Sequence, residues 1–216
     1  LRRILRALRL PARGRVLDVG CGYGKNISLL RAHGLDVLGV DINKELVERN
    51  KQNGLPCCTL GQFKSTRGSF DLILMSHIVE HFSPGELIRW MDGYLDRLRP
   101  GGHLLLVTPL LSPYFFDDFD HIRPYQPVGM QLVFCSDDAQ VQFRARNRLR
   151  LTDIRFRRAP LKRVFARDLY VPGALRVSRS LNLLFAVLFR CSLGLVGRTD
   201  GWIGAYQKES EPTSSK

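Results

Sequence analysis

Residues 16–24 read Val-Leu-Asp-Val-Gly-Cys-Gly-Tyr-Gly, and this stretch decides the fold. A short apolar run ends in Asp18, after which the chain turns glycine-rich. Glycines occupy alternate positions, namely Gly20, Gly22 and Gly24. Glycine permits a positive φ and lets a ligand approach the backbone closely, and the free N–H groups at the start of a helix attract a carboxylate or phosphate. The stretch therefore predicts a strand, a tight turn and a helix start that bind a nucleotide-like ligand.

The spacing of these glycines indicates which class of nucleotide-like ligand the loop binds. A dinucleotide fingerprint needs glycine at position 25, where this chain has Lys25, and no Gly-Lys-Ser/Thr of a phosphate-binding loop follows. The pattern that fits is D-x-G-x-G-x-G, which resembles motif I of the class I S-adenosylmethionine (SAM) dependent methyltransferases. SAM suits such a loop, because its carboxylate fits a helix N-terminus and Asp18 favours its ammonium and sulfonium groups. A purely structural strand-turn-helix unit is the alternative.

Three further motifs follow in the order and spacing of that family. Residues 35–41, Leu-Asp-Val-Leu-Gly-Val-Asp, form a second strand ending in an acid, where a carboxylate can bind both ribose hydroxyls of an adenosine. Residues 70–77, Phe-Asp-Leu-Ile-Leu-Met-Ser-His, resemble the fourth strand, whose end faces the methyl group. Residues 98–108, Leu-Arg-Pro-Gly-Gly-His-Leu-Leu-Leu-Val-Thr, resemble the family's Pro-Gly-Gly turn and fifth strand. Together the four motifs cover residues 15–109.

The resemblance implies a set of residues that hold SAM. It assigns Asp41 to the ribose and Ile42 to the side of the adenine ring. Many relatives carry an acid after the third strand, and here Gln62 takes its place, with a side-chain oxygen that can accept from the adenine amino group. The complete implied set is Asp18, Gly20, Cys21, Gly22, Gly24, Asp41, Ile42, Gln62, Phe63, Ser76 and His77. After methyl transfer the same residues would hold the product, S-adenosylhomocysteine.

Apolar runs and helical segments alternate through the first half of the chain, which indicates a parallel sheet with helices on both faces. We expect strands at 15–19, 36–40, 56–60, 70–75 and 102–108, and helices at 24–33, 43–53 and 84–99. Residues 150–157 look like a sixth strand, and residues 201–208 resemble the family's antiparallel last strand. The expected fold class is therefore a Rossmann-like, doubly wound α/β sheet of seven strands, mostly parallel with the last strand antiparallel.

Length and cysteine usage bound the organisation of the chain. Its 216 residues favour one domain over residues 1–216, with an insertion at about 160–198. The five cysteines are odd in number and contain no C-x-x-C pair, so they indicate neither a disulfide framework nor a zinc site. A reduced cytoplasmic setting follows. The sequence begins with Leu1 rather than Met, so a further segment can precede it.

Positive charge is concentrated near the two ends of the chain. From Arg144 to Arg198, fourteen Lys and Arg stand against Asp153 and Asp168, which accounts for +12 of the formal net charge of +13. A second basic group lies in residues 2–15, where apolar residues at helical spacing predict a short amphipathic helix. Both ends suit a negatively charged surface or substrate. A merely solvated face is the alternative.

The insertion contains an apolar stretch, residues 181–196. It is shorter than the roughly 20 residues that a bilayer-spanning helix needs, and Arg190 interrupts it. Two interpretations remain, a lid or dimer helix and a helix lying on anionic lipid, because arginines flank the apolar face. The expected location is the cytoplasm, with peripheral membrane contact under the second interpretation.

Titratable side chains gather directly after the fourth strand. His77, Glu80 and His81 stand at i, i+3 and i+4, so a helical turn would place them on one face. The pattern resembles the E-x-x-E-H that holds a divalent metal in ubiquinone-pathway O-methyltransferases and RNA 3′-terminal 2′-O-methyltransferases, with His77 replacing the first Glu and His121 as a fourth ligand. Many relatives carry Val-Glu-His without a metal. We therefore expect no metal, and retain these four residues as the weaker alternative.

A general base is the favoured catalytic role. Histidine titrates near neutral pH, so His81 or His121 can take a proton from a hydroxyl acceptor, and Glu80 completes the catalytic set. Alignment alone is the alternative, because a sulfonium is a good leaving group and the enzyme mainly has to orient the displacement in a dry pocket. Residues 108–125, rich in proline, aromatics and acids, fall at the carboxyl edge of the sheet and are expected to line the acceptor pocket.

The sequence favours a hydroxyl acceptor. Enzymes that methylate amino groups of adenine or glutamine carry Asn/Asp-Pro-Pro-Tyr/Phe where this chain has Met75-Ser-His, and Cys57 is misplaced for cytosine methylation. The expected activity is methyl transfer from SAM to a hydroxyl of a small molecule, saccharide or lipid-linked acceptor such as a glycolipid. An RNA methyltransferase using the arginine-rich C-terminal surface and a non-enzymatic SAM-binding protein are the alternatives. Neither the acceptor nor the oligomeric state follows from the sequence.

Overall fold

The computed structural model describes residues 2–136, 142–165, 170–171 and 177–210. The chain divides into two compact units. Unit 1 comprises Leu1–Arg155 and Trp202–Lys216, and unit 2 comprises Phe156–Gly201. Unit 2 nearly coincides with the insertion predicted at 160–198. The organisation as one domain stays a prediction.

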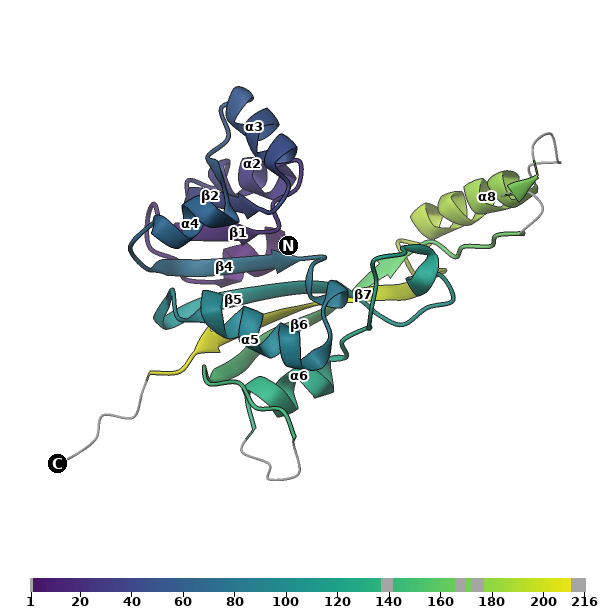
Figure 1. Ribbon diagram of the computed structural model, residues 1–216. Coiled ribbons are helices and arrows are strands. Elements are labelled where there is room, and N and C mark those ends of the chain that lie inside the picture. Colours follow the sequence, from purple (N-terminus) through teal and green to yellow (C-terminus); the bar gives the residue numbers. More distant parts are fainter. Residues whose placement is uncertain (1, 137–141, 166–169, 172–176, 211–216) are drawn as a thin grey trace. The chain divides into compact units, whose positions relative to one another are not determined.

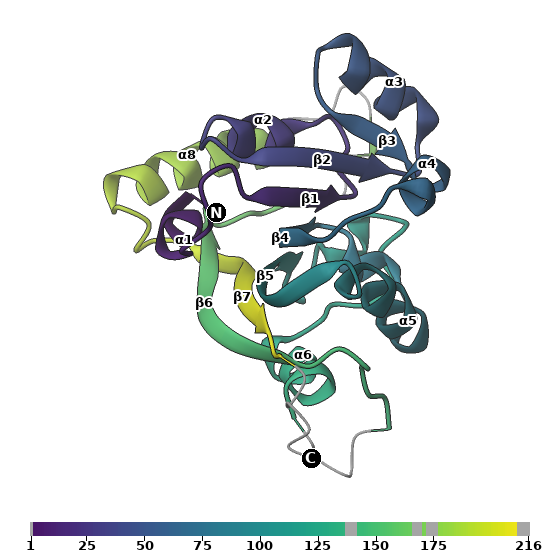
Figure 2. The same cartoon turned by 90° about the vertical axis from the view of Figure 1, so that its left-hand side faces the viewer.

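A seven-stranded sheet forms the framework (Figure 1). Its strands are β1 (Arg15–Val19), β2 (Asp36–Asp41), β3 (Cys57–Thr59), β4 (Phe70–Ser76), β5 (Leu98–Pro109), β6 (Leu149–Ala159) and β7 (Arg198–Lys208). They are ordered β3-β2-β1-β4-β5-β7-β6, and Figure 2 shows β3, β2, β1, β4 and β5 in this order from top to bottom. The pairs among β1 to β5 are parallel, and the last strands are antiparallel. The expected Rossmann-like fold class is confirmed.

Helices connect the strands. They are α1 (Arg2–Ala7), α2 (Lys25–Arg31), α3 (Lys44–Gln52), α4 (Leu60–Ser65), α5 (Pro84–Leu95), α6 (Pro127–Phe134) and α8 (Val177–Cys191), with short 3₁₀ turns η1 (Val79–His81) and η2 (Phe115–Asp117). The amphipathic helix predicted near the N-terminus is present as α1, which buries Ile4 and Leu5.

The hydrophobic core lies on both faces of the sheet, because successive side chains of a strand point to opposite sides. On β1, Leu17 belongs to a cluster with residues of α4, α5 and α6. Its neighbour Val16 belongs to a second cluster with residues of α1, α2 and α3. The middle of the sheet is thus covered on both sides, and its carboxyl edge is left for a ligand.

Three local expectations need correction. Helix α4 was not predicted, although it begins with a capping box in which the Thr59 hydroxyl accepts from Gln62 N and Gln62 Oε1 accepts from Thr59 N. Helix α6, with Pro127 in its first turn, was also missed. The helix predicted for 84–99 ends at Leu95, because the residue before Pro100 disfavours helical backbone and β5 starts at Leu98.

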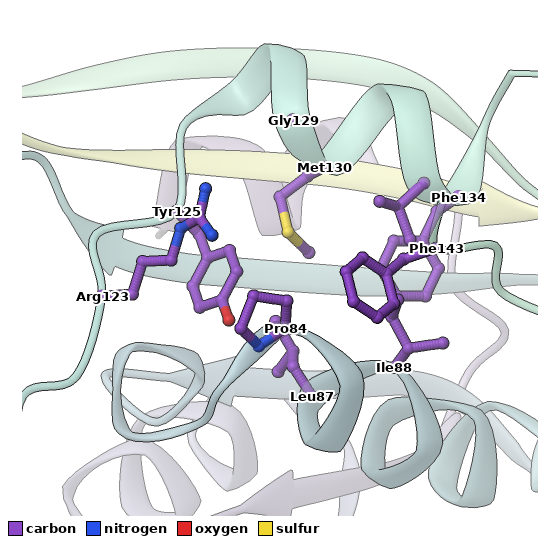
Figure 3. A pocket seen from close by; sticks show the side chains of 10 residues that line it. Pro84, Leu87, Ile88, Arg123, Tyr125, Gly129, Met130, Phe134 and Phe143 are labelled. Atoms are coloured by element: carbon purple, nitrogen blue, oxygen red, sulfur yellow. The ribbon is translucent and has the colours of Figure 1, made fainter. Parts of the chain in front are cut away.

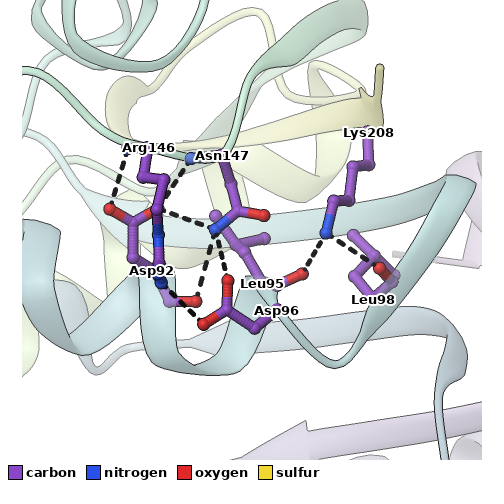
Figure 4. Close-up of polar contacts among 7 residues, drawn as sticks. All are labelled: Asp92, Leu95, Asp96, Leu98, Arg146, Asn147 and Lys208. Carbon is purple, nitrogen blue, oxygen red and sulfur yellow. Dashed lines mark hydrogen bonds and ion pairs between the residues drawn. The ribbon is translucent and has the colours of Figure 1, made fainter. Parts of the chain in front are cut away.

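A buried polar cluster fastens the C-terminal strands of unit 1 to α5 (Figure 4). The Asp92 carboxylate accepts from the backbone N–H groups of Arg146 and Asn147 and from the Asn147 amide, each at 2.9 Å. The Lys208 ammonium, on β7, donates to the carbonyls of Leu95 at 2.7 Å and Leu98 at 3.1 Å. The Lys208 bond to Leu95 satisfies the carbonyl of the last residue of α5, which has no partner within the helix.

Unit 2 is built around α8. The Arg163 N–H donates to Asn182 Oδ1 at 2.8 Å, and the Asn182 amide donates back to Arg163 O at 2.7 Å. The Ser178 hydroxyl accepts from Phe165 N at 2.9 Å. One face of α8 is thereby fixed to the preceding segment. Within the described residues, none of the helices has the length and apolar character to cross a membrane.

Candidate functional site

The glycine-rich loop between β1 and α2 has the predicted geometry. Gly20, Gly22 and Gly24 all have positive φ, at 70°, 51° and 73°. Gly20 also allows a close approach, since a Cβ there would lie 2.5 Å from Ile78 Cδ1. Gly24 is the N-cap of α2, so the first N–H groups of that helix have no cap from a side chain. The loop thus presents backbone donors at the carboxyl edge of the sheet.

Asp41 holds this loop in place. Its Oδ2 accepts from Gly22 N at 2.8 Å, and its Oδ1 accepts from Asn43 N at 2.9 Å. The carbonyl of Gly22 is also held, because the Asn50 amide donates to Gly22 O at 2.7 Å. The loop is therefore organised by β2 and α3 without a ligand.

Asp18 is a buried carboxyl group, with no exposed surface. Neither carboxylate oxygen makes a hydrogen bond within the described residues. Burial raises the pKa of Asp18 to about 7, although the Asn26 side chain, outside strict hydrogen-bond geometry, favours the charged form. A carboxyl group kept in this state is suited to a cationic ligand, which would supply the missing partner charge.

A pocket opens beside the loop, and several of the predicted cofactor residues line it. They are Gly20, Asp41, Ile42 and His77, joined by the predicted catalytic residue His81. Ile42 is 82% exposed, so its side chain is available to a flat ring. Four of the eleven predicted cofactor residues and one predicted catalytic residue thus line one pocket of unit 1.

Seven predicted cofactor residues lie outside the lining of this pocket: Asp18, Gly22 and Gly24, described above, and Cys21, Gln62, Phe63 and Ser76. Gln62 is exposed, and its oxygen already accepts from Thr59 N. Phe63 is buried and stacks on Tyr94 with ring centroids 5.5 Å apart. Cys21 is buried with its Sγ 3.1 Å from Cys57 Sγ, and Ser76 is half-buried at the end of β4.

The sequence reasoning missed the aromatic wall of the pocket. Trp90 and Tyr94 of α5 line it together with Phe82. The rings of Trp90 and Phe82 are 4.6 Å apart, and those of Trp90 and Tyr94 are 4.9 Å apart. The spacing of Trp90 and Tyr94, i and i+4 on a helix, was the available signal. This wall supplies apolar contact for an adenine ring or for an acceptor.

Glu80 connects the end of β4 to the following loop. Its side chain is fully buried, and Oε2 accepts from the Thr108 hydroxyl at 3.1 Å. Oε1 lies 3.2 Å from His77 Nδ1. The Glu80 carbonyl accepts from the N–H groups of Ile122 at 2.9 Å and Arg123 at 3.2 Å. Glu80 therefore connects the pocket to the segment that contains His121 through hydrogen bonds.

The hydrogen bonds of the Glu80 carbonyl hold His81 close to His121, although the two residues are 40 positions apart in the sequence. Their ring centroids are 5.0 Å apart. His81 Nδ1 lies 3.0 Å from Asp120 O, and His121 Nδ1 lies 2.7 Å from Phe115 O. A carbonyl only accepts, so Nδ1 carries the hydrogen in each neutral ring and Nε2 is the basic nitrogen. His121 Nε2 is also 3.6 Å from Asp118 Oδ2.

The same cluster has the composition of a metal site. One ligand atom each from Glu80, His81 and His121 lies within 4.8 Å of the others. His77 is outside this triplet, although it contacts Glu80. Its backbone is left-handed, with φ 55°, and its N–H donates to Val107 O at 2.8 Å. Three of the four residues named as weak metal candidates are thus adjacent.

A second, apolar pocket of unit 1 lies between α5 and α6 (Figure 3). Its volume is about 160 Å³. Figure 3 shows Leu87 and Ile88 facing it from α5, and Met130 and Phe134 from α6. It adjoins the first pocket through Tyr125, whose hydroxyl donates to Phe82 O at 2.9 Å. The predicted acceptor segment, residues 108–125, thus contributes to its lining.

Comparison with known proteins shows the family of this chain. A family model described as a methyltransferase domain matches residues 1–159. The chain belongs to this methyltransferase family. The match confirms the predicted resemblance to the methyltransferases.

The relatives of this methyltransferase differ in what they act on. It is 31% identical over 116 residues to a ubiquinone biosynthesis O-methyltransferase of Xanthomonas axonopodis, covering 49% of this chain and 47% of that protein. It is 32% identical over 117 residues to a ribosomal RNA small subunit methyltransferase C of Chromohalobacter salexigens, covering 50% and 35%. The chain thus spans about half or less of these curated relatives.

A solved structure shows the same fold over nearly the whole chain. It is a SAM dependent methyltransferase from Archaeoglobus fulgidus, with a TM-score of 0.61 and 20% identity, covering 96% of this chain and 91% of that one. The comparisons therefore show the family and the fold, and they leave the acceptor open.

Proposed function

We propose that this methyltransferase methylates a hydroxyl group of a small acceptor with an apolar part, and that His81 or His121 removes the proton. The observation that carries the proposal is the pair of histidines beside the pocket that contains Gly20 and Asp41. Their Nδ1 atoms face carbonyls, which leaves Nε2 of each ring as the basic nitrogen.

The residues present fit SAM. Asp18 has a buried carboxylate without a hydrogen-bond partner, which suits the cationic amino acid end of SAM. The N–H groups at the start of α2 suit its carboxylate, and Asp41 keeps unused lone pairs for a ribose hydroxyl. Gln62 fits the adenine role less well, because its oxygen already accepts from Thr59 N.

Bound SAM supplies a methyl group on a positively charged sulfur, so the acceptor oxygen needs alignment and loss of its proton. The aromatic wall of Trp90 and Tyr94 excludes water from one side of the pocket. The neighbouring cavity between α5 and α6 offers space for an apolar part of the acceptor. Phe116 and Phe119 of the acceptor segment are 63% and 98% exposed, and they add apolar contact outside the cavity.

The activity can be tested with methyl-labelled SAM and fractionated cell extract. We expect label in the organic or small-molecule fraction, in a product that resists the hydrolysis that releases methyl esters. His81→Gln and His121→Gln should each be tested, and the variant that removes the base should lower kcat at least about a hundredfold while calorimetry shows unchanged SAM binding. Asp41→Ala should lose SAM binding. Full activity in both histidine variants contradicts the role of a base.

A metal site is a second proposal for the same histidines, supported by the proximity of Glu80, His81 and His121. The two roles exclude one another, because a nitrogen bound to a metal cannot accept a proton. If the cluster holds a divalent cation, dialysis against a chelator abolishes activity and the added cation restores it. If the histidine is a base, the chelator has no effect on activity, and the Gln variant of that histidine stays inactive whether or not the cation is added.

An RNA acceptor is the alternative supported by charge, since residues 144–198 carry fourteen Lys and Arg against two Asp. Label recovered in RNA, with binding that weakens steeply as salt is raised, would replace the small-molecule proposal. SAM binding without label in any fraction would favour a protein that binds SAM without catalysis.

A further inference from the structure

Helix α8 of unit 2 leaves an aliphatic face uncovered. Its other face is fixed to residues 163–165 through Ser178 and Asn182. No described side chain of α8 is buried. The uncovered side chains are Val177 (50% exposed), Leu183 (68%), Leu184 (52%), Val187 (49%) and Leu188 (41%). Positions 177, 184 and 188 are separated by whole helical turns, so these side chains form one continuous stripe.

The turn after α8 extends this stripe. Leu193 is 94% exposed and Leu195 is 82% exposed. Their exposure is built into the turn, because the Arg158 guanidinium donates to the carbonyls of Gly194 at 3.0 Å, Leu195 at 2.9 Å and Gly197 at 3.2 Å. Leu193 itself has a left-handed backbone, with φ 51°. A turn held by three bonds therefore projects two leucines outward.

Positively charged side chains lie next to the apolar stripe. Residues 156–201 contain nine Lys and Arg and only two Asp, Asp168 and Asp200. Asp200 is engaged by Arg157, with Nε 2.9 Å from Oδ1. Arg179 and Arg190 are exposed and eleven positions apart, which is three helical turns, so they lie on one side of α8. Arg179 is also one turn before Leu183, so this charged side borders the stripe.

We propose that the face formed by α8 and the turn 193–195 docks on an anionic lipid bilayer. A bilayer takes both features together, because its apolar boundary accepts the leucines and its headgroups attract the arginines. A second copy of this chain fits less well, since unit 2 would then approach another surface with the same positive excess. Nucleic acid matches the arginines but gives no burial for seven aliphatic side chains. This docking goes beyond the methyl transfer proposed above and does not depend on it.

Vesicle sedimentation with the full chain tests the proposal. We expect binding to vesicles of phosphatidylcholine mixed with phosphatidylglycerol, and much weaker binding to phosphatidylcholine alone. The double variant Leu193→Ser/Leu195→Ser should weaken binding by about tenfold or more, from the loss of two leucines that would enter the apolar boundary. The matched control Val128→Ser changes another exposed aliphatic residue, 67% exposed on α6, and should bind as the unchanged chain does.

A second variant separates the charge from the apolar contact. Arg179→Gln/Arg190→Gln should reduce binding to the anionic vesicles and reduce its dependence on salt. SAM binding, which uses residues of unit 1, checks that each variant remains folded there. Equal binding to both kinds of vesicle, or a leucine variant that binds as the control does, overturns the proposal. So does a dimer of the unchanged chain that the leucine variant converts to monomer without any vesicle binding.

Discussion

Asp18→Asn is the most informative substitution in unit 1, because the raised pKa of Asp18 makes stability depend on pH. The pKa rises from 3.8 to about 7, mainly through burial. Each pKa unit corresponds to about 1.4 kcal/mol, so folding with an ionised Asp18 costs at most about 4 kcal/mol. This cost is absent below pH 4, grows as the pH rises to about 7, and is constant above it. The asparagine has no such cost at any pH.

The assay is denaturant unfolding of both proteins without SAM across this pH range. The stability of Asp18→Asn relative to the unchanged chain should increase by up to about 4 kcal/mol between pH 4 and pH 8. Taking the difference between the two proteins removes the effect of all other titrating groups. A difference that is constant with pH would refute the reasoning, since it would mean that Asp18 titrates alike in the folded and unfolded chain.

SAM binding should be coupled to the loss of the proton from Asp18. A cationic ligand near Asp18 favours its ionised form, so SAM binding near pH 6 should release a proton. Calorimetry in two buffers with different heats of ionisation detects this release as a buffer-dependent heat. The dependence should disappear in Asp18→Asn, and SAM affinity should fall.

Further substitutions test the packing around a glycine and the hydrogen bonds of a buried carboxylate. Gly39→Ala should destabilise the fold by about 1–3 kcal/mol, because a Cβ there would lie 2.4 Å from Ile27 Cδ1 and 2.8 Å from Cys21 Sγ, whereas Gly61→Ala, with nothing nearer than 4.0 Å, should change stability little. Asp92→Ala should cost about 2–4 kcal/mol by leaving buried donors of the 146–147 segment without an acceptor, measured by urea unfolding, and a loss below 1 kcal/mol would contradict this account.

Much of the fold was predictable because local sequence and tertiary environment agree. Strand β4 is apolar without a break from Leu72 to Met75, as expected of a strand covered on both faces. Helix α4 was missed for the opposite reason, because six residues that include Gly61 carry too few apolar positions to show a helical period. Its capping box, Thr59 with Gln62, was the readable signal.

The site was predictable only in part, because its two halves are assembled differently. The loop and Asp41 follow from motifs in which neighbours in sequence are neighbours in space. The approach of His81 and His121 depends on backbone bonds from Glu80 to Ile122 and Arg123, and no residue type is required for such bonds. Their spacing in sequence therefore carries no trace of the contact.

Those backbone bonds have a consequence for changing the acceptor. The Glu80 carbonyl accepts hydrogen bonds from the backbone of Ile122 and Arg123. The Glu80 carboxylate accepts a hydrogen bond from Thr108 of β5. The exposed side chains of Leu111, Phe116 and Phe119 take part in none of these bonds and can be exchanged without loosening them. Under the proposed function, the residues that bind SAM can thus stay unchanged while exposed residues of the acceptor segment vary. The buried Glu80 connects these two parts of the site. A library of variants aimed at new acceptors should keep Glu80 and vary only the exposed side chains Leu111, Phe116 and Phe119.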